Sequence, residues 1–117
     1  MPSWCHARVR ELGDDAVKHL QALIRIDTTN PPGNETPAAE YLAELLAAVG
    51  LEPTLIGETP DRKNVIARLK GTGAKPPLLL AAHLDVVPAE PESWTHPPFG
   101  GDLADGYLWG RGAIDMK

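Results

Sequence analysis

The sequence predicts an α/β fold, a mixed sheet packed with helices, on three observations. Apolar residues recur at helical spacing before Gly50. After Gly50 the spacing changes to the alternation typical of strands. Residues 78–82 form a continuous apolar run, which is typical of a strand covered on both faces. Helices together with a buried strand indicate a layered α/β structure.

Two helices are predicted. The first covers residues 14–26, where apolar and charged residues alternate with helical period. A loop rich in Pro, Gly and Asn follows at 28–37. The second helix covers 36–49, with Thr36 as its N-cap, Pro37 at its first position and Gly50 as its stop.

The predicted strands follow. Residues 51–57 form a short strand, and residues 64–70 alternate as a half-buried strand does. We expect the 78–82 strand to lie centrally, with 64–70 paired beside it and a turn between them. A Pro-rich loop spans about 86–101, and Asp105-Gly106 predicts a hairpin.

Composition limits the function. The chain has 117 residues, which suits one small domain, and a formal net charge of −5. It therefore lacks the basic surface of a nucleic-acid binder, and its single cysteine excludes a disulfide framework. Since no apolar run has the length of a membrane span and no signal peptide is recognisable, we expect no membrane partner and a cytoplasmic protein.

A histidine and an aspartate follow the predicted buried strand directly. His83 and Asp85 are separated by one residue, close enough for the carboxylate to act on the imidazole. In open α/β sheets ligands gather at the carboxyl ends of strands, and a metal-bound histidine needs an acceptor for its other ring proton. The pair alone leaves an alternative open, because most histidines in such positions are ordinary.

Longer motifs decide between these interpretations. HLDVVP (83–88) and GRGAIDMK (110–117) occur in order, together with IDTTNPPGNE (26–35) and RKNVIARL (62–69). This set resembles the M20 family of metallopeptidases, which includes aminoacylases and succinyl-diaminopimelate deacylases. The resemblance implies that residues 1–117 are the N-terminal part of a zinc-peptidase-like catalytic domain.

The resemblance also assigns residues. His83 matches the histidine that binds one zinc ion, and Asp115 matches the aspartate that bridges two. Asp85 matches the catalytic aspartate that orients the site, and a cis peptide is implied between Asp115 and Met116. The implied cofactor is a pair of Zn²⁺ ions, for which Co²⁺ can substitute. The implied substrate is a small peptide or an N-acyl amino acid, and full-length relatives are often homodimers.

The expected function is zinc-dependent hydrolysis of an amide or peptide bond by the full-length protein. No residue here matches the family's glutamate base, so we expect a truncated chain that is inactive by itself. The alternative is a catalytically dead fragment with a structural or interaction role. A dinucleotide-binding module is disfavoured because GRGAID departs from the G-x-G-x-x-G pattern.

Three further features receive ordinary interpretations. Residues 28–35, TTNPPGNE, are interpreted as a connector. Arg111 is expected to be a structural anchor, and Lys117 a solvated charge.

Overall fold

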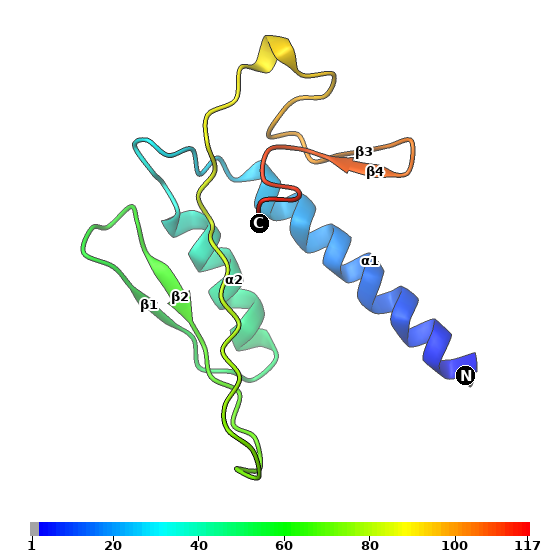
Figure 1. The fold of residues 1–117 in the computed structure, drawn as a ribbon, viewed down its shortest axis with the longest axis vertical. Coiled ribbons are helices and arrows are strands. Elements are labelled where there is room, and N and C mark those ends of the chain that lie inside the picture. The colour runs from blue at the N-terminus through cyan, green and yellow to red at the C-terminus, as the bar shows by residue number, and fades with distance from the viewer. Residues whose placement is uncertain (1–2) are drawn as a thin grey trace. The chain divides into compact units, whose positions relative to one another are not determined.

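The computed structural model describes residues 3–117, with the backbone alone for residues 3–10. It divides into two compact units (Figure 1). One unit comprises the residues up to 27 together with 89–115 and 117, and the other comprises 28–88 and 116. Helices and strands are both present, as predicted. The strands of the described residues form two separate two-stranded antiparallel sheets rather than one mixed sheet.

The first unit is built on helix α1, Ser3–Arg25. It begins well before the predicted start at residue 14, because good helix formers such as Ala, Arg, Glu and Leu precede that residue and Val9 and Leu12 keep the helical spacing of apolar residues. The side chains of Gln21 and Arg25 donate hydrogen bonds to the carbonyls of Gly101 and Gly100, at 2.7 and 3.0 Å. These bonds hold the start of the hairpin against the last turns of α1.

The hairpin joins β3, Asp102–Ala104, to β4, Tyr107–Trp109. Asp105 and Gly106 have φ angles of 53° and 80°, and two positive values are what a primed two-residue turn requires. The predicted hairpin is therefore confirmed. The Pro-rich loop before it contains one 3-10 turn, η1, Pro91–Ser93.

The second unit packs α2, Thr36–Ala48, on a sheet of β1, Thr54–Ile56, and β2, Asn64–Ile66 (Figure 1). Both strands lie inside their predicted ranges. Thr36 is not the N-cap, since Glu35 occupies that position. The Thr36 hydroxyl instead donates to Pro60 O at 2.6 Å and accepts from Lys63 N at 3.1 Å, which ties the helix start to the 60–63 segment.

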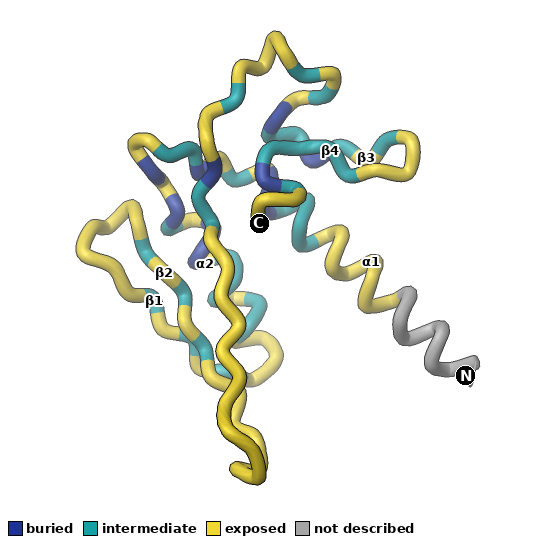
Figure 2. The backbone as a smooth tube through the Cα atoms, in the orientation of Figure 1, coloured by how far each residue is buried: buried dark blue, intermediate teal, exposed yellow. Residues whose placement is uncertain are grey.

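The predicted strand at 78–82 is wrong. This segment is exposed along its length (Figure 2) and forms no strand, and β2 pairs with β1 instead. Leu78, Leu79 and Leu80 are 84%, 86% and 83% exposed. The physical reason is that an apolar run indicates only that its side chains favour burial. A strand also needs a neighbouring strand with which its backbone can form hydrogen bonds. Among the described residues, no strand lies beside it.

Two smaller findings complete the fold. The cis peptides of the described residues are Asn30–Pro31 and Pro31–Pro32, so the expectation of a cis bond at Asp115–Met116 is wrong. That bond is trans, the ordinary state of a non-proline peptide. Within residues 3–117, no helix combines the length and apolar character needed to cross a bilayer.

Candidate active site

The segment that carries His83 and Asp85 is fixed by backbone pairing with residues 28–30. Val86 N donates to Thr28 O at 3.1 Å, and Asn30 N donates to Val86 O at 2.8 Å. The Thr28 hydroxyl adds a 2.6 Å bond to Leu84 O. Thr28 and Val86 are buried, so this pairing lies in the core of the second unit. The two candidate residues therefore sit on an anchored stretch of chain although no strand precedes them.

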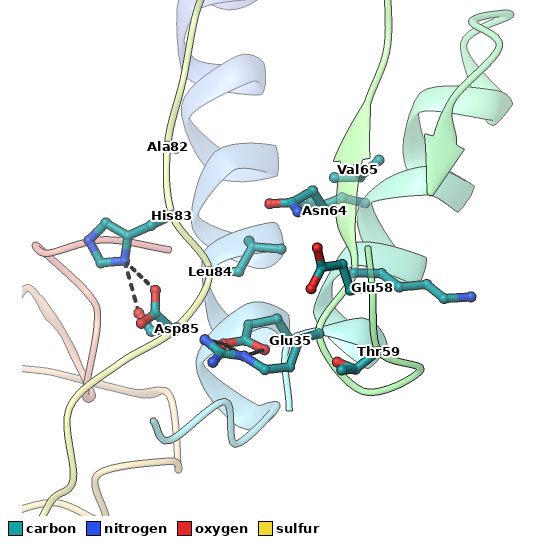
Figure 3. A pocket seen from close by; sticks show the side chains of 12 residues that line it. Glu35, Glu58, Thr59, Asn64, Val65, Ala82, His83, Leu84 and Asp85 are labelled. Carbon is teal, nitrogen blue, oxygen red and sulfur yellow. Dashed lines mark hydrogen bonds and ion pairs between the residues drawn. The ribbon is translucent and has the colours of Figure 1, made fainter. Parts of the chain in front are cut away.

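The imidazole of His83 contacts Asp85 through one nitrogen (Figure 3). Nδ1 lies 2.9 Å from the backbone oxygen of Asp85 and 3.2 Å from its Oδ1. Both atoms are acceptors, so Nδ1 carries the proton of the neutral ring. A metal that binds this ring then uses the lone pair of Nε2, which is the arrangement found in carboxylate–histidine–metal triads.

Asp85 is held from its other side by Asn30. The amide nitrogen Nδ2 of Asn30 donates to Oδ2 of Asp85 at 3.0 Å. This hydrogen bond lowers the pKa of the Asp85 carboxyl below its ordinary value; nearby His83 acts in the same direction, while partial burial opposes both. Asp85 is therefore a carboxylate at neutral pH, with one oxygen directed to each neighbour.

An ion pair closes the loop that supplies Asn30. Glu35 is 8% exposed and accepts three hydrogen bonds from Arg62, at 2.9, 3.1 and 3.3 Å. The Arg62 side chain passes over Gly33, where a Cβ would lie 2.5 Å from Nε. A glycine with φ of +94° leaves the space that this close crossing needs. The segment 28–35 is thus fastened at both ends.

A pocket of about 550 Å³ opens beside these residues (Figure 3). This volume lies within the range of small-molecule sites. Charges of both signs line it, along with the candidate pair; the lining residues are Glu35, Leu42, Glu58, Thr59, Arg62, Lys63, Asn64, Val65, Ala82, His83, Leu84 and Asp85.

Asp115 belongs to the other unit, where it is exposed on the turns that follow β4. Those turns pack on α1: a Cβ at Gly110 would collide with the side chain of Ile24, which is completely buried. Nζ of Lys117 donates to the carbonyl oxygens of Leu23 and Ile26 at the end of α1. Burial lowers the pKa of Lys117 to about 8. The interpretation of Lys117 as a solvated charge is wrong. Its position in the sequence does not reveal that carbonyl oxygens at the end of α1 lie within hydrogen-bonding distance of its ammonium.

The structure confirms the predicted role of Arg111 and the predicted contact of His83 with Asp85. The guanidinium of Arg111 lies 5.0 Å from the centre of the Trp94 ring, and its backbone nitrogen donates to Pro98 O, which confirms the structural anchor. The structure brings His83 and Asp85 into contact. A site shared by this pair and Asp115 stays a prediction. Among the side chains that the structure describes, those of residues 11–117, no group of three or more candidate ligands gathers.

Sequence reasoning missed the role of the 28–35 segment. It is not a plain connector, since it supplies Asn30 to Asp85 and Glu35 to Arg62. The sequence did hold a signal of this role. Asn30, Glu35 and Arg62 lie in the motifs at 26–35 and 62–69, and none of them belongs to a predicted strand. Spacing alone could not pair residues so far apart in the chain.

Comparison with known protein families relates this chain to a class of peptidases. Residues 79–117 match the model of peptidase family M20/M25/M40. This segment holds His83, Asp85 and Asp115, so the predicted relation to the M20 family is confirmed.

Similar proteins extend the match to most of the chain. A succinyl-diaminopimelate desuccinylase of Methylorubrum extorquens is 47% identical over 102 residues, which is 83% of this chain and 26% of that protein. The desuccinylase of Methylorubrum populi is 46% identical over 101 residues, 82% of this chain and 25% of that protein. The chain therefore spans about a quarter of the length of the curated relatives it matches.

Proposed function

We propose that the protein carrying this chain hydrolyses the amide bond of an N-acyl amino acid of the succinyl-diaminopimelate type. The observation that carries the proposal is the His83–Asp85 contact, which lies in the segment matched to a peptidase family. The high identity to desuccinylases supports the substrate class. A pocket lined by Glu58, Arg62 and Lys63 beside this pair fits a small substrate that carries both charges.

The residues present fit a zinc site in part. Imidazole and carboxylate are zinc ligands of choice. His83 would bind through Nε2, because Asp85 engages Nδ1, and Asp115 would bind through its carboxylate. When bound, zinc polarises a carbonyl and lowers the pKa of a water molecule. Further ligands and the glutamate base that the resemblance implies would come from residues beyond this chain.

Asp85 has a defined task in this proposal. Its carboxylate accepts the Nδ1 proton of His83, which fixes the tautomer and the ring orientation. The hydrogen bond from Nδ1–H to this carboxylate also makes the lone pair of Nε2 a stronger ligand for a metal cation. Asp85 thus acts on the reaction through His83.

The homodimer and the cytoplasmic location stay predictions.

The first test is a hydrolysis assay on the protein extended to the length of its relatives, with N-succinyl-diaminopimelate and Zn²⁺ or Co²⁺. We expect metal-dependent turnover that a chelator abolishes. His83→Ala should lower kcat/KM at least about 100-fold, since even residues that merely orient a ligand contribute about 10–100-fold. His19→Ala, on α1, is the matched control and should keep its activity.

The 117-residue chain is the second arm of this test. It should give no turnover, because a general base contributes about 10²–10⁴-fold and none is assigned here. Turnover by this chain that His83→Ala removes would show that the base has been misplaced. If the extended protein also gave no measurable hydrolysis, the alternative of a non-catalytic protein would be favoured.

A further inference from the structure

Asp85 is the centre of a chain of three side chains. Its Oδ1 lies 3.2 Å from Nδ1 of His83, and its Oδ2 lies 3.0 Å from Nδ2 of Asn30. Each carboxylate oxygen therefore has its own donor. A carboxylate held at both oxygens cannot rotate about its last bond without losing a hydrogen bond, so its direction toward the imidazole is set.

Asn30 is suited to hold this carboxylate because its own backbone is fixed. Its N–H donates to Val86 O at 2.8 Å, directly beside Asp85, and its neighbour Thr29 forms a parallel bridge with Val86. The side chain is short, so few rotamers are lost when its amide is aligned. The donor is thus presented by rigid backbone rather than by a mobile side chain.

The neutral charge of Asn30 also matters. A lysine or arginine at this place would neutralise the Asp85 carboxylate and weaken its attraction for the Nδ1 proton of His83. The nearby cation Arg62 is already bound by three hydrogen bonds to Glu35. Asp85 therefore keeps the negative charge that a histidine orienter needs, while its position is fixed by a neutral amide.

We propose that Asn30 is a positioning residue: its amide fixes the carboxylate of Asp85, so that His83 keeps its proton on Nδ1 and presents Nε2 to a metal ion. The inference rests on the proposed function for its catalytic consequence. Its structural part, the influence of Asn30 on the His83 tautomer, stands on the contacts of the Asp85 carboxylate with Asn30 and His83, to which the backbone oxygen of Asp85 adds a second acceptor for Nδ1.

The test compares Asn30→Asp with Asn34→Asp in the extended protein. Asn30→Asp has the same size but faces Asp85 with a carboxylate in place of a donor. Asn34→Asp makes the same charge change on an exposed residue of the same loop. We expect kcat of the first variant to fall about 10–100-fold with KM within about twofold, the usual effect of losing an outer partner of a metal ligand. The control should stay near the parent.

A second measurement separates this inference from the proposed function. Nitrogen NMR of the His83 ring in the metal-free protein should show a protonated Nδ1 in the parent and in Asn34→Asp. Asn30→Ala, which removes the amide without adding charge, should raise the fraction of the Nε2-protonated tautomer, while the backbone oxygen of Asp85, 2.9 Å from Nδ1, keeps part of the rings protonated at Nδ1. This spectrum does not depend on activity, so an inactive protein with the expected tautomers would overturn the function and leave the positioning role standing. An unchanged tautomer in Asn30→Ala, with full kcat in Asn30→Asp, would overturn the role of Asn30.

Discussion

Two segments carry the candidate metal ligands, and different contacts hold each of them in place. Residues 83–86 are held by hydrogen bonds, from the backbone and side chains of residues 28–30. Residues 110–117 combine close packing of Gly110 on Ile24 with hydrogen bonds, from Arg111 N to Pro98 O and from the Lys117 ammonium to carbonyls at the end of α1. The first segment should therefore respond to the loss of polar partners, and the second to added volume and to loss of the cation.

The largest effect is expected at Gly110. A methyl group there would overlap the buried side chain of Ile24, and overpacking of a core costs about 1–3 kcal/mol. Gly110→Ala should lower the free energy of unfolding by that amount, measured by urea denaturation. Gly13→Ala, in the middle of α1 with open space around it, should instead raise stability by about 0.5–1 kcal/mol. Equal effects of the two changes would remove the packing argument.

A smaller effect is expected at Thr28. Its hydroxyl is completely buried and bonds Leu84 O at 2.6 Å. Thr28→Val keeps the shape but leaves that carbonyl without this donor, which costs about 1–2 kcal/mol. Thr28→Ser restores the donor and should recover most of the bonding while losing one methyl group. If valine proved as stable as threonine, hydrogen bonding would not be what anchors the 83–86 segment.

Local signals predicted the parts of the fold whose partners are close in sequence. The hairpin at Asp105-Gly106 and the second helix, with Gly50 at φ of 84°, needed only turn chemistry and helical spacing. The strand predicted at 78–82 was wrong because strand formation depends on pairing with another strand, and the composition of a segment does not show whether such a partner lies beside it. The first helix was underestimated because the prediction began at residue 14, although Val9 and Leu12 continue the helical spacing of apolar residues toward the N-terminus.

The candidate site shows the same division. His83 and Asp85 could be paired from their spacing, because one intervening residue keeps both side chains near each other. Asn30 joins them from 55 residues away, and only the folded 28–30 segment brings its amide to Asp85. The relation of Asp115 to this pair depends on distant contacts as well, and it stays a prediction from the family resemblance.

The smallest effect is expected at Lys117, and it should depend on pH. Burial lowers the pKa of this ammonium to about 8 in the folded protein, from an ordinary value of 10.5. Between these two values the unfolded chain binds more protons than the folded one, so the contribution of Lys117 to stability rises with pH across this window. Below about pH 8 the cost of burying the charge is present in full, and above about pH 10.5 it is gone.

Lys117→Met keeps the hydrocarbon but removes the donor and the titration. It should lose the two bonds to Leu23 O and Ile26 O, worth about 0.5 kcal/mol each, the low end of the usual net value, because the side chain is only half buried. Both the ammonium and the neutral amine can donate two hydrogen bonds, so these bonds persist through the titration. The measurement is the difference in unfolding free energy between parent and variant from about pH 7 to 10.5. It should grow in favour of the parent as pH rises, and a flat difference would mean that the Lys117 ammonium is solvated after all.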